Sequence, residues 1–490
     1  MTSVRRSLAI SFAERYALIA LSLAGNILLA RLLTPEEIGI YSVAVAVIGI
    51  AQILRDFGVG SFLIQERNLT EEHIRTAFGV SLILGGALSV GLFVAAPWVA
   101  QFYAEPRLAD TMRISALNFV VLPFSSISLS LLRRDMEFGR IMIVTLVAAV
   151  VGFLTTIGLA LAGFGPNSMA VGAVATNIVT GAGAWLSRRD RKILPPSLSQ
   201  WRVVLNFGGQ VTASGIVTSV SMDINDLALG KILGFAPVAM ISRAQGLMNI
   251  FHRDVMSAIR GVTYPAFAKA HRDGTNMEES FVAAVTNVTA IAWPFYGFVS
   301  LFALEITRIM FGPQWDEVSR LAPLFCLAGA IAATSSLVLS AVMAAGRIEL
   351  VTFAELIFQP LRAALIVVAA IIFQSLWSCA VAYLLAMALH TPLVYLVKQR
   401  STKTDFAGLI RGLSKSAMVT FGCLAAPAAI CIGLGADRAT PIGMGPFVAA
   451  VGVAIVGWLM SLRLTAHPIA DDPLFRRLFG RQHKEKQEVA

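Results

Sequence analysis

The chain has 490 residues, of which 57% are hydrophobic and only 14% are charged. A soluble globular protein carries about 25% charged residues, so this chain has too few polar side chains to cover a water-exposed surface. Its net charge of +10 falls mostly in loops between apolar segments, which argues against nucleic-acid binding. The composition therefore predicts a protein embedded in a membrane.

Apolar segments of helical length recur from one end of the chain to the other. A transmembrane helix needs about 20 apolar residues, whereas a barrel strand alternates apolar and polar residues over about ten. The stretch Ile141–Ala162, for example, contains no charged residue. The sequence thus predicts an all-α polytopic membrane protein with about 14 transmembrane helices. In chain order these cover residues 8–31, 38–63, 76–100, 111–132, 141–163, 168–187, 203–222, 235–258, 281–304, 318–345, 350–373, 376–397, 408–434 and 443–463.

The start of the second predicted helix carries a capping motif. Thr34 precedes Pro35 at the first helical position, and Glu37 lies three residues after the threonine. A threonine N-cap and a glutamate at this spacing satisfy each other's backbone N–H groups. The motif predicts a capping box, which is a structural role.

Basic residues gather in alternate loops between the predicted helices. With the N-terminus in the cytoplasm, the cytoplasmic segments include the basic stretches 188–202, 398–415 and 476–486, whereas the opposite loop Gly163–Ser168 carries no charge. Cytoplasmic loops of membrane proteins carry an excess of lysine and arginine. The asymmetry predicts a multi-pass protein of the bacterial inner membrane with both termini in the cytoplasm.

The two halves of the chain show a faint internal repeat at an offset of 200 residues. The run Leu29–Ile50 matches Leu229–Ile250 at several positions, and Asn26 falls opposite Asp226. Parallel repeats of this kind are typical of transporters. We predict an N-lobe of six helices over residues 1–192, a C-lobe of six helices over residues 193–400, two further helices over residues 401–463, and a basic cytoplasmic tail over residues 464–490.

Polar side chains recur at helical spacing inside several predicted helices. A charge at the centre of a bilayer costs about 2.5–3.5 kcal/mol on insertion scales, so it normally faces a partner or a hydrated cavity. The sequence therefore predicts a hydrated cavity, although the same rows can serve as contacts between helices. The rows comprise Ser11, Arg15, Ser22 and Asn26; Gln210, Ser214, Thr218, Ser221 and Asn225; Ser242, Arg243, Gln245, Asn249 and His252; and Thr352, Glu355, Gln359 and Arg362.

The arginines and carboxylates of these regions predict two kinds of site. Arg15, Arg243 and Arg362 are permanently charged and can hold a phosphate through two parallel hydrogen bonds. Asn26, Gln210, Ser214 and Gln359 offer hydrogen bonds to sugar hydroxyls. Five acidic residues are candidates for ion coupling, although each can equally be an ion-pair partner: Glu14, Asp56, Asp223, Asp226 and Glu355.

Six motifs lie in order along most of the chain: Leu28–Ala44, Leu54–Gln65, Asp226–Gly234, Ile241–Ile250, Val262–Asp273 and Phe311–Trp315. In their order and spacing they resemble Wzx-type polysaccharide flippases of the multidrug/oligosaccharidyl-lipid/polysaccharide exporter superfamily. The resemblance is strongest to the branch that exports exopolysaccharides of the colanic acid or succinoglycan kind. It implies two pseudo-symmetric, MATE-like six-helix lobes around a central cavity, with two helices appended. It also implies arginines at work in the first, second and eighth helices, where Arg15, Arg55 and Arg243 lie.

The resemblance implies a cargo of undecaprenyl-diphosphate-linked oligosaccharide, flipped from the cytoplasmic to the periplasmic leaflet by alternating access for exopolysaccharide biosynthesis. The expected partners are this cargo, membrane lipids, and a polysaccharide polymerase with its co-polymerase, and no nucleic acid. We expect no enzymatic activity. The four cysteines lack metal-ligand spacing, and we expect no metal and no cofactor.

Two other functions stay open at this point. A MATE-like drug or cation antiporter should carry a compact acidic site in one lobe. A membrane polysaccharide polymerase or ligase should carry a long extracytoplasmic loop, whereas no loop between the predicted helices exceeds about twenty residues.

Overall fold

The computed structural model describes residues 2–56, 59–66, 68–188, 195–202, 224–435 and 440–471. Over these residues the regular secondary structure is entirely helical. Ten of the described helices, or pairs of consecutive helices, are long and apolar enough to cross a membrane. The prediction of an all-α, multi-pass membrane protein is confirmed, and the predicted span 203–222 lies outside the described residues.

The chain divides into two compact units. The first comprises Met1–Ala239 and Met310–Gln314, and the second comprises Met240–Ile309 and Trp315–Ala490. The predicted lobe boundaries at residues 192 and 400, and the assignment of a tail from residue 464, stay predictions.

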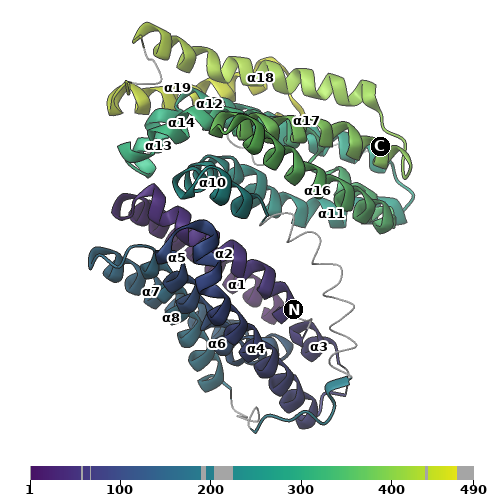
Figure 1. The fold of residues 1–490 in the computed structure, drawn as a ribbon. Helices are drawn as coiled ribbons and strands as arrows, with labels where there is room; N and C mark the ends of the chain where they lie inside the picture. Colours follow the sequence, from purple (N-terminus) through teal and green to yellow (C-terminus); the bar gives the residue numbers. More distant parts are fainter. Residues whose placement is uncertain are drawn as a thin grey trace. The chain divides into compact units, whose positions relative to one another are not determined.

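The first unit contains eight labelled helices (Figure 1). Thr34 caps α2, since its Oγ1 accepts from the Glu37 N–H at 3.3 Å while its own N–H donates to Glu37 Oε2 at 2.8 Å. The predicted capping box is therefore confirmed. The helices are α1 (Thr2–Leu32), α2 (Pro35–Asp56), α3 (Val59–Gln65), α4 (Glu71–Tyr103), α5 (Pro106–Ala116), α6 (Asn118–Arg134), α7 (Phe138–Leu161) and α8 (Pro166–Leu186).

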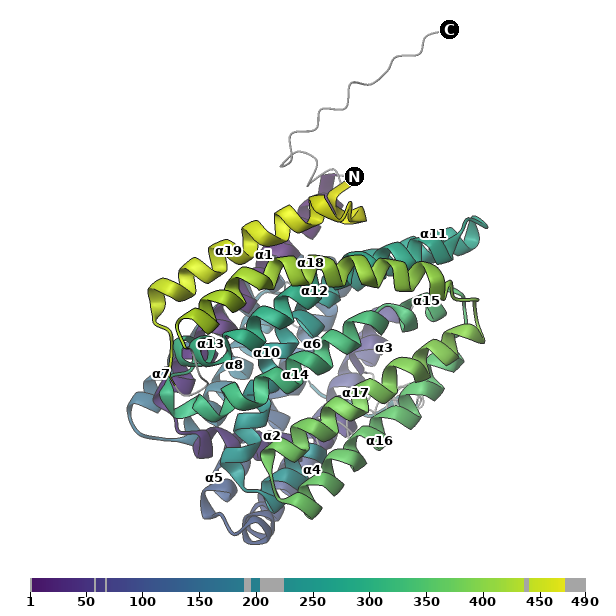
Figure 2. The same ribbon diagram turned by 90° about the horizontal axis from the view of Figure 1, so that it is seen from above.

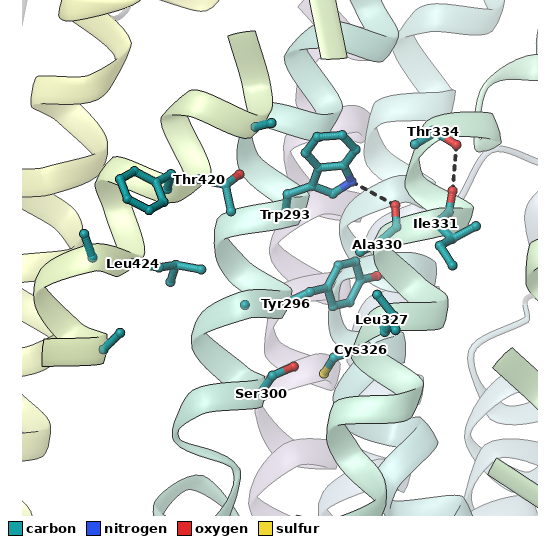
Figure 3. Close-up of a pocket in the computed structure, with 15 residues that line it drawn as sticks. Trp293, Tyr296, Ser300, Cys326, Leu327, Ala330, Ile331, Thr334, Thr420 and Leu424 are labelled. Carbon is teal, nitrogen blue, oxygen red and sulfur yellow. Dashed lines mark hydrogen bonds between the residues drawn. The ribbon is translucent and has the colours of Figure 1, made fainter. Parts of the chain in front are cut away.

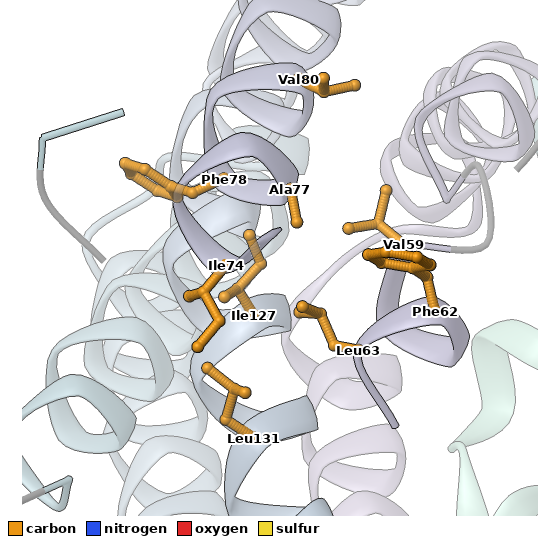
Figure 4. Packing of buried hydrophobic residues seen from close by; sticks show 9 residues of the cluster. All are labelled: Val59, Phe62, Leu63, Ile74, Ala77, Phe78, Val80, Ile127 and Leu131. Carbon is orange, nitrogen blue, oxygen red and sulfur yellow. The ribbon is translucent and has the colours of Figure 1, made fainter. Parts of the chain in front are cut away.

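Two kinds of packing hold the first unit together. An apolar core joins α3, α4 and α6, where Phe62, Phe78 and Ile127 are buried with their neighbours (Figure 4). Helices α7 and α8 instead approach through glycine: a Cβ on Gly152 would lie 1.8 Å from Thr176 Oγ1. Small residues let membrane helices approach closely, so that van der Waals packing stabilises a contact for which lipid provides no hydrophobic driving force.

The second unit holds the remaining labelled helices, and α16 and α17 lie side by side in it (Figures 1 and 2). These two are antiparallel, because the helix ends at Gln374 and restarts after Ser375. The elements are α10 (Phe235–Asn249), which begins in the first unit, η1 (Ile250–Val255), α11 (Met256–Arg272), α12 (Met277–Leu301), α13 (Ala303–Met310), η2 (Pro313–Trp315), α14 (Asp316–Ser335), α15 (Val338–Ala344), α16 (Ile348–Phe373), α17 (Leu376–Gln399), α18 (Phe406–Gly433), α19 (Met444–Leu464) and η3 (Pro468–Asp471).

The second and fourth predicted helices, 38–63 and 111–132, each divide in the structure, into α2 and α3 and into α5 and α6. Two further predicted helices differ from those observed. The eighth was expected to end at residue 258, but it continues through the π-helical turn η1 into α11 and ends at Arg272. The tenth was expected to be continuous, but it divides into α14 and α15 around Ser336 and Leu337. Hydropathy alone missed both features, because α11 is too polar to register as an apolar segment and no glycine or proline marks the second break.

Candidate functional site

A row of polar residues lies on one face of α16. Glu355, Gln359 and Arg362 are spaced four and three residues apart, which places them on successive turns of the same face. The Gln359 Nε2 donates to Glu355 Oε2 at 2.6 Å. Gln359 is only 8% exposed, so this bond orients a carboxylate from within the packed unit.

Helix α17 brings a histidine to the same place. The Nε2 of His390 lies 3.9 Å from Glu355 Oε1. The His390 imidazole packs on the Phe358 ring, with 3.9 Å between ring centroids. The Arg362 guanidinium lies 5.9 Å from the centroid of that same ring. Phe358 thus supports both the histidine and the arginine.

The π-helical turn and α11 supply the next charged groups. His252 of η1 lies within electrostatic range of Arg260 on α11 and Arg362 on α16. His390 is in range of both Arg362 and His252. A π-helical turn is rare and is found frequently at functional sites. We name this set the α16 cluster, and its members are His252, Arg260, Glu355, Gln359, Arg362 and His390.

Three atoms of the α16 cluster are buried without a hydrogen-bond partner among the described residues. They are Gln359 Oε1, an acceptor; Arg362 Nε, a donor; and His390 Nε2, whose role depends on the tautomer. Buried polar atoms in proteins are nearly always hydrogen-bonded. The α16 cluster therefore offers donors and an acceptor to a ligand that carries both negative charge and hydroxyl groups.

Arg243 and Gln245 extend the polar region along α10. The Arg243 guanidinium lies 5.5 Å from the centroid of the buried Trp315 ring, a cation–π contact. Gln245 is within hydrogen-bonding reach of the Tyr383 hydroxyl, and Tyr383 in turn faces Arg362. The predicted residues Arg243, Glu355, Gln359 and Arg362 thus all lie in the second unit.

The other predicted site residues lie in the first unit or outside the described residues. Thr145 Oγ1 of α7 donates to Glu14 Oε1 at 2.7 Å. Asn26 Nδ2 donates to the Ser22 carbonyl at 2.9 Å within α1. Arg55 is half-buried at the end of α2, and Asp226 is half-buried in the helical segment 224–232. The side chains of Arg15 and Asp56, and all of Gln210, Ser214 and Asp223, lie outside the described residues. A single cavity that joins all of these residues stays a prediction.

An apolar groove of about 710 Å³ opens elsewhere in the second unit (Figure 3). It lies between α12, α14 and α18, and most of its lining is hydrocarbon, including Leu327, Phe421 and Leu424. The Trp293 Nε1 at its edge donates to the Ala330 carbonyl at 2.9 Å. The groove has no signal in the sequence, because its walls come from segments that are distant along the chain. Among the described residues, no group of three or more His, Cys, Asp or Glu is placed to hold a metal ion.

His390 is not among the site residues predicted from the sequence. The signal was the turn at Gln374 and Ser375, which the sequence already shows as a very short loop. In an antiparallel pair, residues at equal distance from the turn lie opposite each other. Gln359 and His390 are equidistant from this turn.

Comparison with known proteins assigns the chain to a family. The model of a family described as "Polysaccharide biosynthesis protein" matches residues 28–320, which is more than half of the chain. The chain belongs to this family. The family is one of transporters of the Wzx kind and not of enzymes, so the predicted resemblance to Wzx-type proteins is confirmed.

Curated relatives come from the same area of biosynthesis. The chain is 25% identical to the lipopolysaccharide biosynthesis protein WzxC of Escherichia coli (strain K12), over 68% of each chain. It is 24% identical to the succinoglycan biosynthesis transport protein ExoT of Rhizobium meliloti (strain 1021), over 59% of this chain and 58% of that one.

Solved structures show the same fold at low sequence identity. The lipid II flippase MurJ, in an inward closed conformation, superposes with a TM-score of 0.71 at 12% identity, over 97% of this chain and 100% of that one. An inward-facing multidrug transporter of the MATE family gives a TM-score of 0.56 at 17% identity, over 82% of this chain and 94% of that one. The predicted MATE-like fold is confirmed.

Proposed function

We propose that this polysaccharide biosynthesis transporter flips an undecaprenyl-diphosphate-linked oligosaccharide repeat unit from the cytoplasmic to the periplasmic leaflet of the bacterial inner membrane. The observation that carries the proposal is the composition of the α16 cluster. The cluster contains two arginines and one carboxylate. It also contains a buried donor and a buried acceptor that have no partner among the described residues. A glycosyl diphosphate presents both of the groups that these atoms can bind.

Three residues of the α16 cluster bind the head group in this proposal. Arg362 and Arg260 hold the diphosphate, because a guanidinium stays charged in an apolar setting and fits phosphate oxygens through paired N–H groups. The Gln359 Oε1 accepts from a sugar hydroxyl. The polyprenyl chain stays in lipid, so the α16 cluster needs to bind only the polar head.

The remaining predicted residues complete the proposed path. Arg243 offers a further cation from the predicted C-lobe, to which Gln210 and Ser214 add polar groups. Arg15, Arg55 and Asn26 offer polar groups from the predicted N-lobe. Both termini lie in the cytoplasm in this scheme, and the two predicted lobes alternate in exposing the site. Cargo shifts such an equilibrium only through its different affinities for the two states. The flipped unit then passes to a polymerase and its co-polymerase for exopolysaccharide synthesis.

The charge of the α16 cluster distinguishes this proposal from a MATE-like drug or cation antiporter. A site for an organic cation needs an excess of carboxylate, whereas this cluster has Glu355 against Arg260 and Arg362. Because like charges repel strongly where the local dielectric constant is low, an anionic head is the better fit.

The sidedness of the lipid-linked repeat unit tests the proposal. Cells depleted of this protein would be converted to spheroplasts and probed with a membrane-impermeant lectin. Repeat units should stay hidden on the cytoplasmic side and reappear with the wild type or with Arg320→Gln, an exposed arginine of the same unit. Arg362→Gln should not restore them. Units that reach the outer face without this protein would instead contradict the proposal.

A further inference from the structure

We propose that the α16 cluster takes up one proton together with each anionic head group, and that His390 carries this proton. The inference rests on the proposed function and adds the ligand that accompanies the cargo. Its starting point is a gap: His390 Nε2 and Glu355 Oε1 are 3.9 Å apart, too far for a hydrogen bond. Both residues are mostly buried.

The contacts around this gap hold its two sides in place. Gln359 donates to the other oxygen of Glu355 at 2.6 Å, which leaves Oε1 toward the histidine. Phe358 packs on the imidazole face, which restricts the ring to motion along that face. If this distance shortened by about 1 Å, the Nε2–H of His390 would form a charge-assisted hydrogen bond with the Glu355 carboxylate. The pair is therefore poised to accept one proton without rearrangement of the helices.

The charged groups that face His390 determine when the proton binds. Helix α16 presents Glu355 and Arg362, and η1 presents His252, behind which lies Arg260 of α11. On α17 itself Tyr383 faces Arg362, and from α14 the Ser335 hydroxyl contacts Thr391, the residue after His390. Among the residues that the structure describes, cations thus outnumber carboxylates around the imidazole.

Cargo reverses this balance. Without it, a proton on His390 adds a positive charge next to Arg362 and is disfavoured. A diphosphate diester bound at Arg362 and Arg260 neutralises both guanidinium charges and leaves Glu355 as the neighbour that matters. The imidazolium is then stabilised by the carboxylate. Because coupling between two ligands is reciprocal, the proton strengthens head-group binding as much as the head group strengthens proton binding.

The proton enters from the solution on the side where the cargo binds and returns to solution on the side where the cargo leaves. No bond other than N–H forms or breaks. The cargo thus crosses with part of its negative charge neutralised. A proton moved in the opposite direction would require head-group binding to expel a proton, which is the reverse of what this arrangement of charges favours.

Proton uptake on binding can be counted by calorimetry on the purified full-length protein. The probe is synthetic farnesyl-diphosphoryl-glucose, a diester whose phosphates do not titrate near neutral pH. Binding heats in HEPES and in Tris at pH 7 give the number of protons exchanged. We expect about one proton taken up by the wild type, and an affinity that falls up to about tenfold per pH unit as the pH rises above neutral.

Three variants locate the proton. His390→Gln should reduce the proton count to near zero while it keeps most of the affinity at pH 8. His252→Gln and His271→Gln, the latter at an exposed position near the end of α11, should leave the count unchanged. The pH dependence of the wild type is a readout that does not depend on any variant folding correctly.

The outcomes separate this inference from the proposed function. Binding of the probe with no proton exchange, or with proton release, would overturn the inference and leave the flippase proposal intact. A proton count that disappears in His252→Gln but persists in His390→Gln would overturn the assignment to His390. Failure of the wild type to bind the probe at all would count against the proposed function itself.

Discussion

Two groups of charges within the second unit differ in how fully they are satisfied. At the end of α17, Lys398 is completely buried, and its Nζ donates to Glu278, to Thr404 Oγ1 at 3.1 Å and to the Lys403 carbonyl at 3.4 Å. The other oxygen of Glu278 accepts from the Asp405 N–H at 3.0 Å. Two turns earlier on the same helix, His390 belongs to a cluster in which three buried atoms have no partner among the described residues.

The difference separates structural charges from charges available to a ligand. The ion pair of Lys398 and Glu278 connects α12, α17 and the start of α18. All three Lys398 N–H groups, and both Glu278 oxygens, already have protein partners. The α16 cluster carries comparable charges with donors and an acceptor still open. The combination of charged side chains with buried donors and an acceptor that lack partners among the described residues therefore marks the α16 cluster as the candidate binding site.

The largest effect should come from breaking the ion pair of Lys398 and Glu278. Lys398→Met leaves Glu278 without its cation, and removal of one partner of a buried pair typically costs about 3–5 kcal/mol. We expect a large drop in the thermal midpoint in detergent and a low yield of folded protein. The double variant Lys398→Met with Glu278→Gln should regain much of the loss, whereas equal instability of single and double variants would contradict a pairing role.

The next largest effect should be on transport and not on stability. Arg362→Gln removes charge-assisted hydrogen bonds to the diphosphate, each worth about 1.5–3 kcal/mol, so flipping should slow by roughly tenfold to a hundredfold. The free energy of unfolding should change by less than about 1 kcal/mol, because the Nε of Arg362 has no hydrogen-bond partner among the described residues. Measured flipping rates and thermal midpoints for the same preparation decide between the two roles.

A smaller, pH-dependent effect should come from the turn after α19. His467 is fully buried, its Nδ1 accepts from the Ile469 N–H at 3.2 Å, and its Nε2 lies 3.3 Å from Ser416 Oγ. Burial, with a contribution from Lys415, lowers the pKa of His467 to about 4. Since the unfolded chain binds this proton at about pH 6.5, stability should fall by about 2 kcal/mol as the pH drops from 6.5 toward 4.

Unfolding midpoints at pH 7 and pH 5 measure this effect. The control is His467→Asn, whose side-chain oxygen can still accept from the Ile469 N–H but does not titrate. It should flatten the difference between the two pH values. A variant as sensitive to pH as the wild type would place the effect elsewhere.

The smallest effect should come from an exposed ion pair. Arg320 lies 3.1 Å from Glu317 at the start of α14, but its side chain is 64% exposed. Exposed pairs contribute about 0–1 kcal/mol. Arg320→Gln should therefore change neither the thermal midpoint nor the flipping rate measurably, and a clear loss of transport would show that simple reduction of positive charge explains the Arg362 result.

Local periodicity predicted part of the site, and tertiary pairing supplied the rest. Helical spacing alone predicts that Glu355, Gln359 and Arg362 share one face. The order of Thr34, Pro35 and Glu37 likewise predicts the capping box. His390 and Arg260 joined these residues only through the packing of α17 and the π-helical turn, which no local pattern encodes. The walls of the apolar groove come from α12, α14 and α18, and the break at Ser336 and Leu337 carries no sequence signal, so both required the structure.

The central claim is that Arg362 holds a diphosphate during flipping, and reconstituted protein tests it most directly. A fluorescent undecaprenyl-diphosphate-linked disaccharide would be placed in proteoliposomes, and its exposure would be followed with a membrane-impermeant quencher. We predict rapid access to both leaflets with the wild type and with Arg320→Gln, and access to the inner leaflet that is roughly tenfold to a hundredfold slower with Arg362→Gln. Equal flipping by Arg362→Gln and the wild type would contradict the claim.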